Sequence, residues 1–330
     1  MALAPFIAIA HRALPPQRRD EMIAATCLIA PWTVHPDGHD VGGALCADGK
    51  PLEASVAFDP RGGVELRLVG DIGAGIAASD VAQRRHRVIE RCARFAGPGD
   101  AGAMVAELAA RHIEWRPPTA RALAFVGAGA SAQRPFHKMF YFGFAGMAPA
   151  AAQTLVARHA DAAVVERLWA LATQAGLQLQ GVGYDLEGGR ITKLQIYARF
   201  AIDAGQDMRQ RLSQIGDEDI ARCADMMAAV LPAPVAPSSH HLLGLGVATE
   251  GGAAGRMAPR LYAPLPAHGI DRMADLQPAW TALASRWRTT LPEATAPADA
   301  CTPTLLSLSS AAGSERCAVY FSLAESTSPS

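Results

Sequence analysis

The chain has 330 residues, of which 50% are hydrophobic and 18% are charged, and this composition excludes a disordered chain and allows a large buried core. Its 30 Lys and Arg residues are matched by 31 Asp and Glu residues, which gives a formal net charge of -1. A nucleic-acid-binding protein normally carries a basic excess, so the sequence speaks against a nucleic-acid partner. Any anion must therefore be bound by locally placed cations.

Five β-hairpins recur along the chain at a spacing of roughly 60 residues. In chain order they pair residues 52–59 with 64–70, 122–126 with 136–144, 182–186 with 191–200, 241–249 with 257–265, and 304–309 with 316–323. Glycine-containing turns such as Pro60-Arg61-Gly62-Gly63 join the two strands. The repeat indicates one supersecondary unit used five times.

Helical segments are predicted between the hairpins, because apolar residues recur there at helical spacing. They cover approximately residues 79–96, 104–113, 155–176, 208–230 with a break near Gly216, and 273–287. Residues 1–50 form an N-terminal segment that we also expect to be helical. The apolar stripes are typical of faces that pack on a core.

Alternation along the strands divides each into an apolar face and a polar face. For example, Leu194 and Ile196 alternate with Lys193, Gln195 and Tyr197. Ten antiparallel strands can close into a barrel with the helices packed outside, and the polar face then lines the lumen. We therefore predict an α+β protein of five αββα repeats forming a ten-stranded antiparallel barrel, in one domain over residues 1–330 with its core at 50–325.

Tyrosines and cations recur at matching places on these strands. All five tyrosines lie in the hairpins, and Tyr197, Tyr262 and Tyr320 occupy equivalent positions on second strands. The candidate cations on second strands are Arg67, Lys138, Lys193, Arg260 and Arg316. Converging cations are suited to a polyanion such as diphosphate, and tyrosine faces are suited to a cationic intermediate. The competing interpretation is a set of ordinary solvent-facing strand residues.

This arrangement resembles the ABBA-fold prenyltransferases, and most closely the cyanobactin-type branch that modifies ribosomal peptides (RiPPs). The matching motifs are Leu52-Glu53-Ala54-Ser55 followed by Arg67, then Lys138, Ile196-Tyr197-Ala198, Leu261-Tyr262 and Val319-Tyr320. The resemblance spans residues 50–325 and depends on the order and spacing of short motifs. Many relatives have Lys where Gln195 stands, so the phosphate contact on that hairpin departs from the family pattern.

The resemblance implies a prenyltransferase, which moves a dimethylallyl or geranyl group from its diphosphate to a nucleophilic side chain of a peptide. The implied diphosphate-binding residues are Arg67, Lys138, Lys193, Arg260 and Arg316, and the implied cation-shielding residues are Tyr197, Tyr262 and Tyr320. Glu53 would accept the acceptor's proton, and His241 and Gln195 are further candidates for an acceptor or phosphate contact. Family members commonly use Mg²⁺. No aspartate-rich motif dictates a metal site here, so we expect Mg²⁺ to be carried by the diphosphate.

Two alternatives remain open from the sequence. One is a prenyltransferase for small aromatic molecules, and the other is a non-catalytic barrel that binds an anionic lipid or a nucleotide. Two Gly-x-Gly-x-x-Ala strings, at 73–78 and 127–132, are formally compatible with a dinucleotide site. The first lacks a strand-end acidic residue about 20 positions later, and the second runs into Arg134-Pro135.

The six cysteines contain no Cys-x-x-Cys pair, which favours a reducing, cytoplasmic environment. The N-terminal apolar run 2–10 is short, contains Pro5 and lacks basic residues, so it is a poor signal peptide. No stretch of about 18 apolar residues is present, and no membrane span is expected. We expect a cytoplasmic monomer.

Overall fold

The structure is a computed structural model of the whole chain. It describes residues 4–33, 52–74, 81–96, 100–114, 123–132, 135–142, 149–157, 161–187, 190–202, 207–235, 239–249, 257–288, 301–311 and 314–323.

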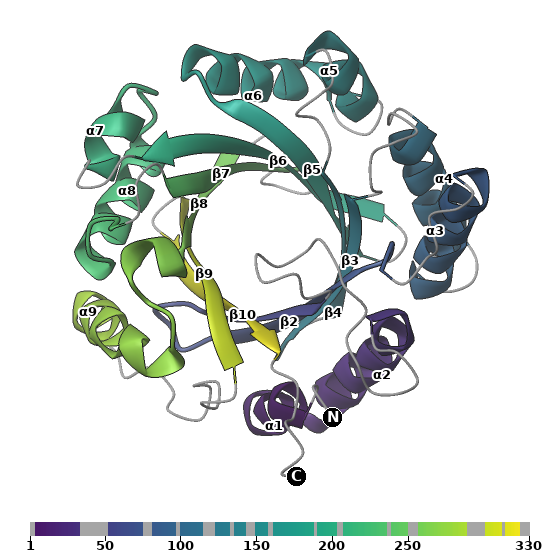
Figure 1. The fold of residues 1–330 in the computed structure, drawn as a ribbon, viewed down its shortest axis with the longest axis horizontal. Helices are drawn as coiled ribbons and strands as arrows, with labels where there is room; N and C mark the ends of the chain where they lie inside the picture. The colour runs from purple at the N-terminus through teal and green to yellow at the C-terminus, as the bar shows by residue number, and fades with distance from the viewer. Residues whose placement is uncertain are drawn as a thin grey trace.

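The described strands form a closed barrel in which every neighbouring pair is antiparallel (Figure 1). In chain order the strands are β1 (Leu52–Phe58), β2 (Val64–Asp71), β3 (Leu123–Ser131), β4 (Pro135–Phe142), β5 (Gln178–Glu187), β6 (Arg190–Ile202), β7 (Ser239–Ala248), β8 (Met257–Pro264), β9 (Cys301–Ala311) and β10 (Ser314–Leu323). Each strand pairs with its neighbours in sequence, and β1 pairs with β10 to close the ring. The predicted ten-stranded antiparallel barrel is confirmed.

Helices surround the barrel on the outside (Figure 1). They are α1 (Ala4–Ala13), α2 (Pro16–Thr33), α3 (Val81–Ala96), α4 (Asp100–Glu114), α5 (Pro149–Ala157), α6 (Ala162–Gln174), α7 (Met208–Ser213), α8 (Glu218–Val230) and α9 (Gln277–Trp287), with the short 3-10 turns η2 (Leu265–His268) and η3 (Met273–Leu276) before α9. The break near Gly216 is present, because Gly216 has φ of 73° between α7 and α8. The single helix predicted over 155–176 is wrong: the Asp161 side chain accepts bonds from Ala163 and Val164 and starts α6 as a separate helix.

The main hydrophobic core lies between the barrel and the helices. Leu66, Leu68, Leu194 and Ile196 are fully buried there on the outward faces of β2 and β6. A separate, smaller buried cluster lies inside the barrel and contains Ala57, Ala318 and the three matched tyrosines. The alternation predicted from the sequence therefore places apolar side chains outward and the cation-bearing face in the lumen.

Two of the five tyrosines belong to the outer core instead. Tyr141 and Tyr184 are fully buried outside the barrel, where His112 of α4 stacks on Tyr141 with ring centroids 4.2 Å apart. His112 Nε2 also lies 2.9 Å from the Tyr184 hydroxyl. The tyrosines thus mark the lumen only at the three equivalent positions on β6, β8 and β10.

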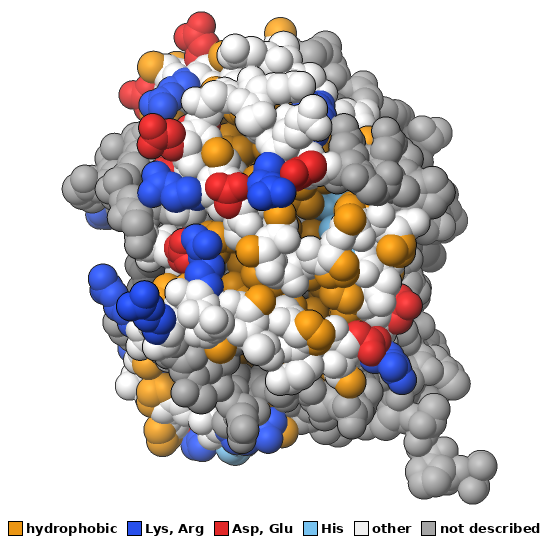
Figure 2. All heavy atoms as spheres, turned by 90° about the vertical axis from the view of Figure 1, so that its left-hand side faces the viewer, with side chains coloured by type: hydrophobic (Ala, Val, Ile, Leu, Met, Phe, Trp, Pro, Cys, Tyr) orange, Lys and Arg blue, Asp and Glu red, His pale blue; other side chains and the backbone are white. Residues whose placement is uncertain are grey.

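The outer surface over α7, α8 and α9 mixes charged and apolar side chains, and the apolar patches are interrupted by polar groups (Figure 2). Within the part of the chain that the structure describes, Leu28 and Val235 are the large hydrophobic residues that are exposed. The described helices include none that combines the length and the apolar character needed to cross a bilayer.

Candidate active site in the barrel lumen

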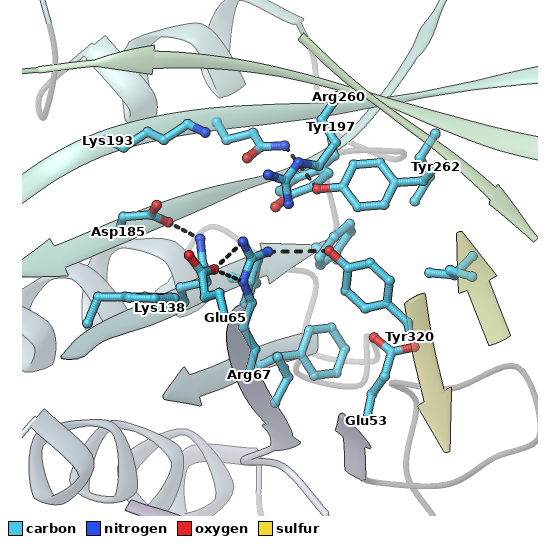
Figure 3. A pocket seen from close by; sticks show the side chains of 18 of the residues that line it. Glu53, Glu65, Arg67, Lys138, Asp185, Lys193, Tyr197, Arg260, Tyr262 and Tyr320 are labelled. Atoms are coloured by element: carbon cyan, nitrogen blue, oxygen red, sulfur yellow. Dashed lines mark hydrogen bonds and ion pairs between the residues drawn. The ribbon is translucent and has the colours of Figure 1, made fainter. Parts of the chain in front are cut away.

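The lumen holds a cavity of about 480 Å³, lined by inward-facing side chains from strands all around the barrel (Figure 3). Within the described ranges, five cations and four carboxylates line it: Arg67, Lys138, Lys193, Arg260 and Arg316, and Glu53, Glu65, Asp185 and Glu187. Aromatic rings form much of the rest: Phe125, Phe136, Phe140, Phe142, Tyr197, Tyr262 and Tyr320. A polar, charged region and an aromatic region therefore share one cavity.

The structure brings together ten of the eleven site residues predicted from the sequence. These ten are Glu53, Arg67, Lys138, Lys193, Gln195, Tyr197, Arg260, Tyr262, Arg316 and Tyr320. They come from β1, β2, β4, β6, β8 and β10, and they converge because residues two apart on a strand share a face.

His241 is the exception, and its proposed contact with acceptor or phosphate does not fit the structure. Its side chain is fully buried on the outer face of β7, where its ring lies 5.7 Å from that of Phe200. His241 Nε2 is 3.0 Å from Nε2 of His268, and Nδ1 of His268 is 2.7 Å from the Pro232 carbonyl oxygen. The alternation along β7 turns His241 away from the lumen while it turns Leu242 into it.

Arg67 is held by a carboxylate that the sequence analysis did not select. Glu65, two residues earlier on β2, accepts bonds from Arg67 and also from Arg316, whose Nη2 is 3.1 Å from Glu65 Oε2. The opposite edge of the Arg67 guanidinium points to Tyr320, with Nη1 3.5 Å from the hydroxyl (Figure 3). Burial alone would raise the pKa of Glu65, but the cations around it, Arg67 first, hold that pKa well below its ordinary value.

Lys138 is paired with Asp185 across β4 and β5. Burial lowers the pKa of Lys138, and Asp185 opposes that effect. Asp185 also lies opposite Lys193 in the β5–β6 register. Burial lowers the pKa of Lys193 from 10.5 to about 7, although Asp185 counteracts part of the shift. The lumen therefore contains a lysine whose charge changes near neutral pH.

The tyrosines form a continuous aromatic wall. The ring centroids of Tyr197 and Tyr262, and of Tyr262 and Tyr320, are each 5.9 Å apart. Phe142 extends the wall, 5.2 Å from Tyr197. Gln195 Nε2 donates a hydrogen bond of 3.1 Å to the Tyr262 hydroxyl. Such π faces stabilise a nearby cation and exclude water.

Two glycines on β7 make room for the polar side chains of β6. A Cβ at Gly244 would lie 2.0 Å from Gln195 Nε2, and a Cβ at Gly246 would lie 2.5 Å from Lys193 Cε. Because these glycines lack a side chain, Gln195 and Lys193 can lie flat along the barrel wall. The two glycines thus determine where the polar side chains of β6 can lie.

Glu53 lies apart from the cation cluster, at the aromatic side of the cavity (Figure 3). It is buried, and Thr304 of β9 donates a hydrogen bond of 2.8 Å to its Oε1. A buried carboxylate beside an aromatic space is placed to receive a proton from a bound molecule.

The site also contains residues that were not predicted from the sequence, namely Glu65, Asp185 and the phenylalanines of β4. A usable signal exists for each: Glu65 shares a strand face with Arg67, and Phe136, Phe140 and Phe142 share one with Lys138. Asp185 carries a weaker signal, because its position opposite two lysines is visible only once the strand register is known. Within the described ranges, no group of three or more His, Cys, Asp or Glu side chains is arranged to hold a metal ion.

No protein-family profile and no curated protein matches the sequence. The structure is nevertheless similar to solved structures of prenyltransferases. For 6-dimethylallyltryptophan synthase from Micromonospora olivasterospora, in complex with DMASPP and Trp, the TM-score is 0.69 at 17% identity, over 98% of this chain and 97% of that chain. For 5-dimethylallyltryptophan synthase from Streptomyces coelicolor, it is 0.65 at 14% identity, over 99% and 97%. For AnaPT from Neosartorya fischeri, it is 0.62 at 12% identity, over 96% and 90%.

At these identities the similarity establishes the fold. The chain has the ten-stranded antiparallel barrel of the ABBA prenyltransferases, with its helices outside.

Proposed function

We propose that this protein is a prenyltransferase, which transfers an isoprenyl group from an allylic diphosphate to an aromatic acceptor. The observation that carries the proposal is the pairing, in one closed lumen, of a five-cation cluster with a wall of three tyrosines. A diphosphate leaving group and an allylic cation form together when the donor's C–O bond breaks, and the two regions complement those two charges. The similarity to structures of dimethylallyltryptophan synthases supports the same function.

The chain's residues divide the reaction between them. The departing diphosphate is neutralised by the five cations Arg67, Lys138, Lys193, Arg260 and Arg316. Tyr197, Tyr262 and Tyr320 shield the allylic cation from water, which would otherwise capture it. A nucleophilic atom of the acceptor then bonds to the allylic carbon, and Glu53 takes the proton that the acceptor loses.

The acceptor is an aromatic molecule of small size in this proposal. Phe125, Phe142 and Leu242 line the cavity near the tyrosine wall, and flat apolar surfaces of this kind suit an indole or phenol ring. One solved neighbour has tryptophan bound, and another, NotF, has brevianamide F bound. A ribosomal peptide, the acceptor expected from the sequence resemblance, is the second candidate and would present the same kind of ring from a longer chain.

Magnesium is proposed as a companion of the donor. The described residues hold no ready-made metal cluster, so a Mg²⁺ ion would be bound chiefly through diphosphate oxygens. Its role would be to offset charge on the leaving group.

The first experiment is calorimetric titration with dimethylallyl and geranyl thiodiphosphates, which react slowly and need no acceptor. Micromolar binding of one analogue is expected. An acceptor screen by mass spectrometry, with tryptophan, tyrosine and short peptides containing them, would follow with the matching donor. Absence of binding for both analogues would reject the prenyltransferase proposal and favour a lipid- or nucleotide-binding barrel.

A further inference from the structure

Cations of the lumen are already paired with carboxylates of the chain itself. Glu65 bonds to Arg67 and Arg316, and Asp185 bonds to Lys138. Figure 3 shows both carboxylates pointing into the same cluster rather than away from it. A diphosphate bound to these cations would therefore meet two carboxylates that are already bonded to them.

The two ion pairs form one electrostatic unit. The pKa of Glu65 is lowered by Lys138 as well as by both arginines, and the pKa of Asp185 is lowered by Lys138, Lys193 and Arg67 against the opposing effect of burial. The geometry shows how the unit is built. Glu65 lies beside Ala57 of β1, which in turn lies beside Ala318 of β10, so two small residues let Glu65 and Arg316 meet across β1. Asp185 lies between Lys138 and Lys193 in the strand register.

Charge in the lumen is nearly balanced before any ligand enters. Among the residues that the structure describes, five cations face four carboxylates around the cavity, and Glu65, Arg67, Lys138 and Arg260 are each less than 9% exposed. Buried cations without counter-charges would strongly destabilise the empty barrel. A bound diphosphate supplies those counter-charges itself, and then a carboxylate next to it becomes a like charge in a medium of low dielectric constant.

We propose that Glu65 and Asp185 are resident counter-anions that hold the cation cluster in the empty lumen and compete with the donor's diphosphate for the same cations. This inference rests on the proposed function and assigns a role to two residues on the same site. The carboxylates stabilise the empty barrel at the expense of donor affinity. They also favour release of the product diphosphate, because they regain their partners when it leaves.

The test compares Glu65→Gln, Asp185→Asn and the unmodified protein by calorimetric titration with inorganic diphosphate in buffer containing EDTA. Each substitution keeps the side chain's shape and removes its charge. We expect each variant to bind inorganic diphosphate about tenfold more tightly. Without ligand each variant should melt at a lower temperature, and saturating diphosphate should raise its melting temperature more than it raises that of the unmodified protein.

The matched control is Glu315→Gln. Like Glu65 and Asp185, Glu315 is an ion-paired carboxylate. It lies on β10, however, and it bonds outside the lumen to Arg286, at 2.6 Å, and to Trp287. This variant should bind diphosphate with unchanged affinity. If the Glu65 variant does not fold, Asp185→Asn decides the question, because the Asp185 side chain is less buried, with 23% exposed against 9% for Glu65.

Equal or weaker diphosphate binding in both lumen variants would overturn the proposal. Tighter binding in one variant alone would restrict the counter-anion role to that residue and remove the other. The titrations are repeated with Mg²⁺ in place of EDTA. Weaker binding by the variants than by the unmodified protein in Mg²⁺, with no binding by any of the three in EDTA, would also overturn the proposal, because the carboxylates would then act with the metal rather than against the phosphate. Failure of all three proteins to bind diphosphate under both conditions would instead reject the prenyltransferase function itself.

Discussion

Lys193 links the site to pH, because burial lowers its pKa to about 7. A diphosphate ligand favours the ammonium form, so donor affinity should decrease as pH rises above 7, by up to about tenfold per pH unit. Titrations with dimethylallyl thiodiphosphate between pH 7.5 and 9 would measure this, since phosphate groups there are already ionised. Lys193→Met should abolish most of the slope, and an identical slope in that variant would assign the titration to another group.

The same lysine affects stability in the opposite direction. Between pH 7 and its ordinary value of 10.5, the unfolded chain holds a proton that folded Lys193 has released. The free energy of unfolding therefore gains a positive contribution as pH rises through this window. The contribution from Lys193 should vanish in Lys193→Met, as followed by denaturant unfolding at pH 7 and pH 9.

Arg67 and Lys138 should be required for donor binding. Arg67→Ala and Lys138→Ala each remove a buried cation and leave its carboxylate partner without it, so the lumen loses attraction for diphosphate. We expect kcat/KM for the donor to decrease about a hundredfold or more. Arg286→Ala, which removes a cation from the outer surface, should leave donor kinetics unchanged. Near-normal kinetics in both lumen variants would exclude those cations from the site.

The Tyr262 ring should matter more than its hydroxyl. Tyr262→Phe removes the acceptor of the 3.1 Å bond from Gln195 but keeps the aromatic face, so kcat/KM should fall less than about tenfold. Tyr262→Ala removes the face and admits water, and it should raise the fraction of donor lost to hydrolysis. Measurement of prenyl alcohol beside prenylated product separates the two effects. A large loss in the Phe variant would indicate that the hydroxyl contacts phosphate.

At the scale of the strands, β5 contains two glycines whose replacement should have different effects. Gly181 lies against backbone, and Gly183 lies against aromatic side chains. A Cβ at Gly181 would lie 2.2 Å from the Tyr141 carbonyl oxygen, next to an irregularity in the β5–β6 register. In Gly181→Ala the added methyl group must therefore displace the β4 backbone, which cannot move as easily as a side chain. We expect a loss of about 3 kcal/mol in unfolding free energy. At Gly183 the nearest atoms belong to the rings of Phe140 and Tyr197, at 3.0 and 3.1 Å. Gly183→Ala should cost less stability and mainly narrow the lumen; equal losses in chemical denaturation would contradict this distinction.

The strands are also the level at which the sequence is most informative. Alternation in a run such as Lys193, Leu194, Gln195, Ile196 and Tyr197 is enough to assign the inward and outward faces, because a half-buried strand has a period of two. Helix boundaries are harder to predict: nothing in the apolar spacing near Asp161 reveals that its side chain caps a new helix. Partners across strands cannot be predicted this way at all. The bond from Thr304 to Glu53 joins side chains 251 positions apart on β9 and β1, two strands that are brought together because both pair with β10.

His241 illustrates the limit for a single residue. Two adjacent histidines at the start of a strand point to opposite faces, and a local shift of one position decides which of them meets the lumen. Here neither His240 nor His241 lines the cavity. Leu242 is the β7 side chain that does. Polarity alone therefore did not identify the inward residue.

At the scale of the whole molecule, the β9–β10 hairpin is needed to close the barrel. Deletion of residues 301–330 removes β9 and β10 and leaves β1 and β8 as unpaired edges around an open lumen. We expect this truncated chain to be insoluble or unfolded by circular dichroism, while deletion of 324–330 alone, which keeps all ten strands, should retain the fold. A folded protein lacking 301–330 would contradict the dependence on closure.

Closure of the ring also bears on how the protein is made. Nine of the ten strand pairings join neighbours in sequence, so they can form one after another as the nascent chain leaves the ribosome. The pairing of β1 with β10 must wait until β10 has been synthesised, and the contacts of Glu65 with Arg316 and of Arg67 with Tyr320 bridge 251 and 253 positions across this seam. The cation cluster is consequently completed only when β10, which carries Arg316, is in place. Under the proposed function, a nascent chain that ends before β10 cannot yet offer the donor's diphosphate the full set of cations.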